Sequence, residues 1–145
     1  MTAWKQNDNT NFNFYNAHEV NNIWQYSTED TIKRNLRDRL KESKIFVLLI
    51  GEKTKYLYKY VRWEIEQAIK LDLPIIVVNL NGLRYQDEDK CPAIIRDELA
   101  IHISFNSRIL QKALEEWRQD HVNLRSENKK GPYYFKSDVY QHLGL

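Results

Sequence analysis

Residues 45–50 read Ile-Phe-Val-Leu-Leu-Ile and are followed by Gly51, and this stretch decides the fold. Apolar side chains without alternation are typical of a strand buried on both faces, and such strands belong to parallel sheets that helices cover. Residues 74–80 form a second segment of this kind, Pro-Ile-Ile-Val-Val-Asn-Leu, entered by a proline and left through Asn81-Gly82. We therefore expect two neighbouring parallel strands of an α/β sheet, each buried on both faces.

Two amphipathic helices accompany these strands. The first follows the cap candidates Ser27-Thr28, and its apolar residues recur at every fourth position: Ile32, Leu36 and Leu40. The second lies between the two strands, within residues 56–73, and its apolar stripe consists of Val61, Ile65, Ala68 and Ile69. The order helix, strand, helix, strand predicts right-handed βαβ winding, and so a mostly parallel sheet flanked by helices.

The second half of the chain gives weaker signals. Apolar side chains at 101, 103 and 105 alternate with His102 and Ser104, which predicts a strand with one face in water, near the edge of the sheet. Asn106 or Ser107 can cap a final helix that carries apolar residues as far as Trp117. A short helix is expected within residues 94–99.

Beyond residue 117 the chain turns polar and then aromatic, and we expect this tail to pack back on the domain through Tyr133, Tyr134, Phe135 and Tyr140.

Length and composition limit the classes of protein. The 145 residues predict one domain over residues 1–145, with a core at about 12–117 and a C-terminal extension, 118–145, packed on it. With 42% hydrophobic and 29% charged residues, the composition excludes intrinsic disorder and a membrane protein. A net charge of +2 is too weak to indicate nucleic acid or an anionic membrane as a partner. A single cysteine, Cys91, excludes an internal disulfide, and without a signal peptide the expected compartment is the cytoplasm.

The carboxyl ends of parallel strands are where α/β proteins bind ligands, so we searched the loops that follow the strands. Gly51 lets the backbone leave the first strand sharply, toward the helix that carries Tyr60 and Glu64. At about 100° per residue, Glu64 lies some 80–90° from the centre of the apolar stripe, where a carboxylate is partly desolvated and still reaches a cleft. The alternative is that Glu64 is an ordinary solvated charge. Trp63 points away from the stripe, which indicates a contact surface unless the C-terminal aromatic residues cover it.

Other chemistries lack a signature. The four histidines are widely spaced and share no ligand spacing with Cys91, so no metal site is expected. The acidic run at 87–89 lacks the alternating oxygen ligands of a calcium loop. No glycine-rich phosphate loop and no Gly-x-Ser-x-Gly motif occur.

Taken together, three features resemble the TIR-like proteins of the bacterial Thoeris anti-phage system. They are the strand that ends in Ile-Gly at 50–51, the segment Tyr-Val-Arg-Trp-Glu-Ile at 60–65 and the second strand. In that family a hydrophobic strand ending in Ile-Gly precedes a helix that starts aromatic-Val-Arg-aromatic-Glu-Ile. The resemblance extends over residues 12–117, and its specific part is residues 45–78.

The resemblance implies a flavodoxin-like fold with a five-stranded parallel sheet. It also implies cleavage of NAD at the nicotinamide glycosidic bond, followed by cyclisation to an ADP-ribose signal that switches on a partner effector. The family's catalytic glutamate corresponds to Glu64, and NAD is a substrate rather than a cofactor. On this interpretation Tyr60 and Trp63 wall the pocket, Gly51 lets its loop approach the dinucleotide, and the reaction needs no metal.

One departure from the family keeps a second class of function open. Family members begin with a strand, whereas residues 1–5 here are typical of the end of a helix, with a short strand around Phe12 and Phe14, so we expect the first strand to be lacking. Its absence favours a non-catalytic TIR-like or flavodoxin-like interaction module that self-associates or binds a partner protein. The surroundings of Glu64 and Trp63 favour the enzyme. A receiver-type phosphotransfer domain is a distant third hypothesis, because its acidic pocket would lie on that first strand.

Overall fold

The structure, a computed structural model, describes residues 29–52 and 59–145. The expected cap at Ser27-Thr28 and the expected elements around residues 1–14 lie outside these residues. The described helices and strands follow one another in the order α3 (Glu29–Glu42), β1 (Phe46–Ile50), α4 (Lys59–Lys70), β2 (Ile75–Asn79), α5 (Ala93–Arg96), β3 (Ala100–Ser104), α6 (Ser107–Ser126), β4 (Pro132–Tyr134) and α7 (Ser137–His142).

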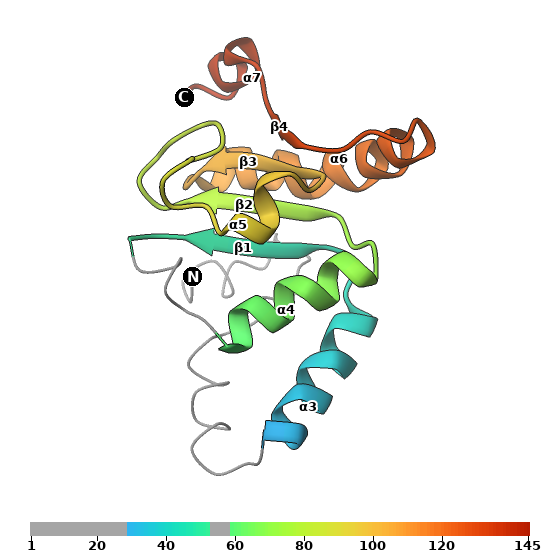
Figure 1. The fold of residues 1–145 in the computed structure, drawn as a ribbon. Helices are drawn as coiled ribbons and strands as arrows, with labels where there is room; N and C mark the ends of the chain where they lie inside the picture. The colour runs from blue at the N-terminus through green and yellow to red at the C-terminus, as the bar shows by residue number, and fades with distance from the viewer. Residues whose placement is uncertain (1–28, 53–58) are drawn as a thin grey trace.

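The described strands form one parallel sheet in the order β1-β2-β3-β4 (Figure 1). Phe46 of β1 pairs with Ile75 of β2, and the register carries through to Ile50 opposite Asn79. The prediction that the two apolar runs are neighbouring parallel strands is therefore confirmed. An α/β architecture of the flavodoxin-like kind is confirmed as well.

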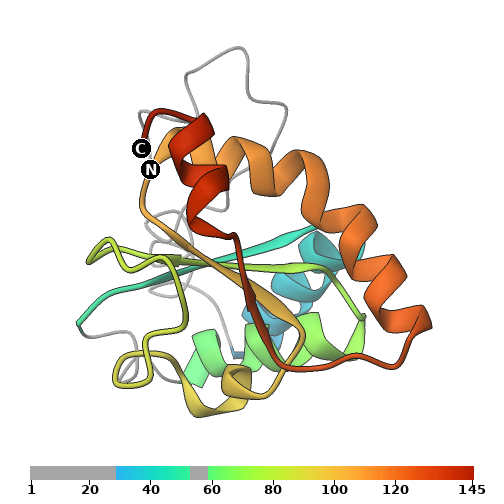
Figure 2. The same ribbon diagram turned by 90° about the horizontal axis from the view of Figure 1, so that it is seen from above.

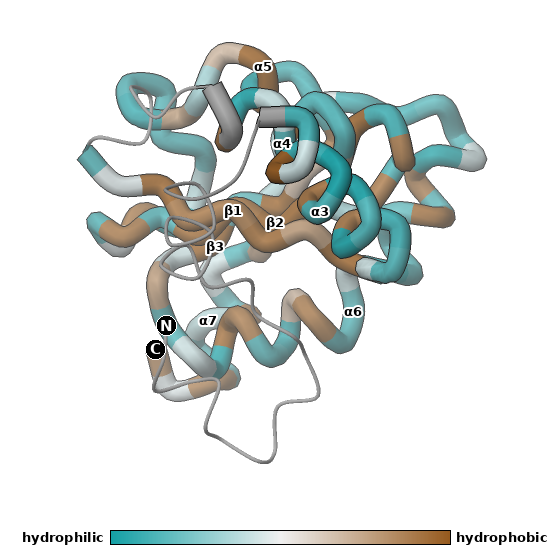
Figure 3. The backbone as a smooth tube through the Cα atoms, turned by 90° about the horizontal axis from the view of Figure 1, so that it is seen from below, coloured by the Kyte–Doolittle hydropathy of each residue, from teal (hydrophilic) through white to brown (hydrophobic). Residues whose placement is uncertain are grey.

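Helices cover the sheet on two faces, as Figures 1 and 2 show: α6 lies on one face, and α4 and α5 lie on the other. Successive side chains of a strand point to opposite faces, so each strand contributes to both cores. Ile76 and Val78 of β2 pack with α6, whereas Ile75 and Val77 pack with the residues of α4 and α5. Figure 3 shows the strands as the most hydrophobic part of the molecule, between the two helical layers.

The two predicted strands differ in how deeply they are buried. All five residues of β2 are buried, as expected for a strand with neighbours on both sides. In β1 only Leu48 and Ile50 are buried, and the other three residues are half-buried. Within residues 29–52 and 59–145, β1 pairs with β2 alone, which explains its lower burial.

The prediction for β3 was wrong. We expected a strand with one wet face near the edge of the sheet, yet all five of its residues are buried, including His102 and Ser104. The reason is β4, which pairs with Ala100, Ile101 and His102 and so moves β3 into the interior of the sheet. Phe105, which we placed in the strand, follows it and is 42% exposed.

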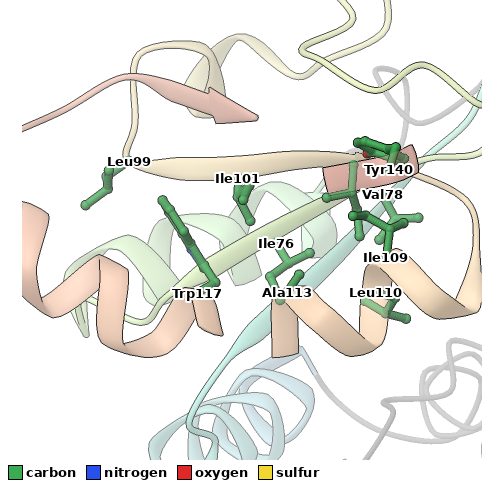
Figure 4. Packing of buried hydrophobic residues seen from close by; sticks show 10 residues of the cluster. Ile76, Val78, Leu99, Ile101, Ile109, Leu110, Ala113, Trp117 and Tyr140 are labelled. Atoms are coloured by element: carbon green, nitrogen blue, oxygen red, sulfur yellow. The ribbon is translucent and has the colours of Figure 1, made fainter. Parts of the chain in front are cut away.

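The C-terminal residues form defined structure against this sheet. Helix α6 is capped by the side chain of Asn106, which accepts a hydrogen bond of 2.8 Å from the backbone N–H of Arg108. It continues well past Trp117 to Ser126, because His121 on its apolar face is buried and lies 3.1 Å from the carbonyl oxygen of Asp72. Figure 4 shows Trp117 directed toward Ile101, and Tyr140 of α7 beside Val78 and Ile109.

Helix α3 packs alongside α4 rather than across the sheet (Figure 1). Its apolar residues Ile32, Leu36 and Leu40 are buried, as the fourfold spacing predicts. None of the described helices is both long and apolar enough to cross a membrane. The layers thus leave the carboxyl ends of β1, β2 and β3 along one edge of the sheet, and α4 begins at this edge.

Candidate functional site

The carboxyl ends of three strands meet at one level of the sheet. Ile50, Asn79 and Ser104 are partners in the register of β1, β2 and β3. Backbone bonds extend the pairing by one step: the N–H of Leu80 donates to the carbonyl of Ile50 at 2.9 Å, and the N–H of Phe105 to that of Asn79 at 3.1 Å. The loops that follow the three strands therefore leave from one edge, which is where open α/β sheets bind ligands.

Glu64 lies in the second turn of α4, the helix that starts from this edge. Ile65 and Ala68 are buried in the core and fix α4 against the sheet, which leaves Glu64 half-buried on the flank of the helix. Burial raises the pKa of the Glu64 carboxyl from 4.5 to about 7. In the part of the chain that the structure describes, no hydrogen bond or ion pair reaches this carboxylate.

A carboxyl group with these properties is a candidate for catalysis. Structural carboxylates are normally solvated or paired, because an unpaired charge loses free energy when it leaves water. Perturbed groups of this kind cluster at functional sites. The half-buried position and raised pKa of Glu64 favour this interpretation over that of an ordinary solvated charge, and its role in catalysis stays a prediction.

Glu66, two residues along the same helix, is a useful contrast. Its Oε1 accepts a hydrogen bond from Nε of Arg62 at 3.1 Å, in an ion pair of the i, i+4 kind on the surface of α4. Helix α4 thus carries two glutamates in one turn, one paired and one without a partner among residues 29–52 and 59–145.

Trp63 contacts helix α3. The guanidinium carbon of Arg37 lies 5.7 Å from the centre of the indole ring, and Nζ of Lys33 lies 6.0 Å from it. The C-terminal aromatic residues therefore do not cover Trp63, as one alternative proposed; Tyr133 and Tyr140 belong instead to the core around α6. The ring of Trp63 is half-buried between the two helices.

The backbone shows where the other two predicted site residues, Gly51 and Tyr60, lie. Gly51 directly follows β1 at the carboxyl edge. Tyr60 belongs to the first turn of α4, four residues before Glu64, and helix geometry puts positions four apart on one face. The side chain of Tyr60 lies outside the described part of the structure.

Sequence reasoning missed Asn79, the one polar residue in the apolar run of β2. It is 1% exposed, and its Nδ2 donates to the carbonyl oxygens of Leu83 at 3.1 Å and of Tyr85 at 2.8 Å. These bonds fix the loop that follows β2. The Oδ1 atom of Asn79 has no hydrogen-bond partner among the described residues. A lone amide at the end of an apolar strand was the signal that could have identified it.

A second feature that the sequence did not reveal is the contact between α7 and the carboxyl edge. The hydroxyl of Tyr140 accepts a hydrogen bond of 3.3 Å from the backbone N–H of Ser104. The guanidinium of Arg84, from the loop after β2, lies 4.2 Å from the centre of the Tyr140 ring. The C-terminal segment therefore borders the edge on the side of β3.

Nucleophilic catalysis by cysteine finds no support at Cys91. The thiol is buried, and burial raises its pKa from 9.0 to about 11, so it is protonated at neutral pH. The described residues also contain no group of three or more side chains suited to hold a metal ion.

A comparison with known protein families gives a match to the first part of the chain. The sequence profile of the family described as Thoeris protein ThsB, TIR-like domain, matches residues 1–85. This match contains α3, β1, α4 and β2, and with them Glu64 and Trp63. No curated protein matches the chain.

Proposed function

Because the chain belongs to the family of Thoeris ThsB TIR-like domains, we propose that it is a cytoplasmic NAD-cleaving enzyme of anti-phage defence, with Glu64 as its catalytic carboxylate. The observation that supports this proposal is the half-buried, unpaired carboxyl group of Glu64 on the helix that follows β1. Family membership gives the context of defence, and the properties of Glu64 suit the chemistry.

The reaction breaks the bond between C1′ of the ribose and the pyridinium nitrogen of nicotinamide. The electron pair of this bond goes to the nitrogen, so nicotinamide leaves as a neutral molecule and positive charge develops on C1′ and the ring oxygen of the ribose. An ionised carboxylate beside the sugar stabilises this oxocarbenium-like transition state. In a partly desolvated site the attraction is stronger than in water.

The cation is then captured by a nucleophile. Attack by water forms ADP-ribose and releases one proton, whereas attack by a nucleophilic atom of the same ADP-ribose unit forms a cyclic product. We propose the cyclic product as a diffusible signal for a partner effector. Closure to a ring requires water to be kept from C1′, and a half-buried position of Glu64 favours this.

The test compares two glutamate variants in one helix turn. Glu64→Gln keeps the shape of the side chain and removes its charge, so release of nicotinamide from NAD should fall about 100-fold to 1,000-fold. Glu66→Gln removes only a surface ion pair with Arg62 and should change the rate less than about twofold. The assay measures nicotinamide released by the purified protein, with its activating signal present.

The pH profile gives a second readout of the same experiment. The pKa of Glu64 is raised to about 7, so the carboxyl is neutral below this value and cannot stabilise a cation. For the wild-type protein, kcat/KM should fall about tenfold per pH unit below pH 7 and level off above it.

Equal rates for wild type and Glu64→Gln would remove Glu64 from the mechanism. Inactivity of every form would leave the non-catalytic interaction module as the better description.

A further inference from the structure

We propose that helix α7 is a strap: a segment that folds only when it docks, and that then holds the loop after β2, residues 80–86, at the carboxyl edge. The contact that joins the two segments is the guanidinium of Arg84 over the ring of Tyr140. This inference goes beyond the proposed function and does not depend on it, because it concerns a coupling within the free protein.

Helix α7 depends on its docking for its structure. It has six residues, and its N-cap residue, Lys136, makes no side-chain hydrogen bond to the first turn. Helices of this length are not stable in water by themselves. The segment therefore has two states, folded against the domain and released, and its packing decides the balance between them.

Packing and two hydrogen bonds hold α7 in the docked state. Tyr140 is fully buried beside Val78 (Figure 4), and its hydroxyl accepts the hydrogen bond of 3.3 Å from the backbone N–H of Ser104. The Nη1 atom of Arg108 donates to the carbonyl oxygen of Leu143 at 3.0 Å. Release of α7 would break both hydrogen bonds and move the ring of Tyr140 out of the core.

The loop after β2 is held at its base and from above. At its base, Nδ2 of Asn79 donates to the carbonyl oxygens of Leu83 and Tyr85, the two neighbours of Arg84. From above, the Tyr140 ring holds the Arg84 side chain, whose guanidinium carbon lies 4.2 Å from the ring centre, well within the range of a cation–π contact. In the part of the chain that the structure describes, no carboxylate forms an ion pair with Arg84.

The contact between Arg84 and Tyr140 exists only while α7 is docked. The docking of α7 and the order of the loop are therefore coupled by the free energy of this contact, and the coupling acts equally in both directions. A binding partner that takes up α7 would loosen the loop, and a ligand that draws Arg84 from the ring would loosen α7. The loop lies at the edge where open α/β sheets bind ligands, so the strap would control the order of that edge.

Amide hydrogen exchange of the purified protein, followed by NMR, tests the coupling. The N–H of Gly82 in the loop donates to the carbonyl of Asn79 at 3.0 Å, and the N–H of Leu145 donates to that of Tyr140 at 2.9 Å. Arg84→Gln removes the cation and keeps a polar side chain. Both amides should then exchange about twofold to fivefold faster, because a cation–π contact of this size is lost from the closed state.

Two variants of Tyr140 separate the ring from the hydroxyl. Tyr140→Phe keeps the ring at Arg84, so exchange of Gly82 should stay as in wild type when it is compared with Val77, a buried amide of β2 that reports on global unfolding. Tyr140→Leu removes the ring and should speed exchange of Gly82 about twofold to fivefold on the same scale. In the Tyr140→Leu background, Arg84→Gln should have no further effect.

Arg118→Gln is the matched control. Arg118 is an exposed arginine of α6, and among the described residues no ion pair or ring contact involves it. This variant should leave exchange of Gly82 and Leu145 as in wild type. Equal exchange of the loop in Arg84→Gln and Arg118→Gln would overturn the inference. An effect of Arg84→Gln that persists in full in the Tyr140→Leu background would overturn it too, because Arg84 would then act without the ring.

Discussion

Glu64 keeps its proton at a pH where an exposed glutamate is fully ionised, because α4 holds it half out of water without a partner in the described part of the chain. Such a group lowers the stability of the fold when it is charged. Proteins keep groups that destabilise the folded state at functional sites, where activity requires a side chain that stability alone would not favour. The effect of Glu64 on the free energy of unfolding can be measured independently of any activity.

Glu64→Gln should stabilise the protein at high pH. The native pKa of about 7 lies above the unfolded value of 4.5, so the native state binds more protons and wild-type stability from this group falls as pH rises from 4.5 to 7. The full shift corresponds to about 3 kcal/mol, and partial exposure reduces this to about 1–2 kcal/mol. In urea denaturation, the variant should be more stable than wild type at pH 8 and equal to it near pH 4.5. An equal difference at both values would show that Glu64 is not desolvated.

At the scale of elements, the two strong apolar runs and the helix between them could be predicted because their periodicities are unambiguous. Strand β3 could not, since burial of its polar residues depends on β4, which pairs with it from a distant part of the chain. The end of α6 was missed for a related reason: polar residues after Trp117 give no apolar stripe, and His121 is buried by the turn at Asp72.

His102, at the centre of β3, should make the protein sensitive to acid. It is fully buried, and neither ring nitrogen has a hydrogen-bond partner among the described residues. Desolvation lowers its pKa from 6.5 to about 4, so the unfolded state binds more protons and stability falls as pH decreases from 6.5 to 4. The loss is up to about 3 kcal/mol. His102→Leu should remove this pH dependence in denaturant titrations.

The exposed His142 provides the control for this experiment. Its Nδ1 lies 2.7 Å from the carbonyl oxygen of Asp138 on the surface of α7. His142→Leu, at an exposed position, should change the free energy of unfolding at pH 7 by less than about 0.5 kcal/mol. If His102→Leu keeps the wild-type slope, another group controls the response to acid.

At the scale of the whole molecule, the candidate site draws on both halves of the sheet. The sequence located the carboxyl edge, Gly51 and Glu64, because these follow from one strand and one helix. It could not locate Asn79, Arg84 and Tyr140 as neighbours of the edge, since their positions depend on how separate segments pack. The contact of Trp63 with α3 depends likewise on the packing of two helices.

Tyr140 connects the C-terminal segment to this edge, and its hydroxyl should contribute to stability. Among the residues that the structure describes, β4 pairs with residues 100–102 and does not reach Ser104, whose buried N–H donates to the Tyr140 hydroxyl instead. Tyr140→Phe leaves this N–H unpaired and should lower the free energy of unfolding by about 1–2 kcal/mol in urea, with an unchanged m value. Tyr134→Phe, at a residue that is 62% exposed, should change it by less than about 0.5 kcal/mol. Equal effects of the two variants would contradict this role of Tyr140.

The pairing of β3 with β4 also has a consequence for the order of events during protein synthesis. The ribosome makes β3, then all of α6, and only afterwards the residues of β4 and α7. At about 5–20 residues per second, this interval lasts roughly a few seconds. Until β4 docks, β3 has unpaired backbone groups along one side, and such an edge is a template for pairing with other chains once it leaves the ribosome. A nascent chain of this protein therefore has a brief period in which a chaperone that shields β3 would raise its folding yield.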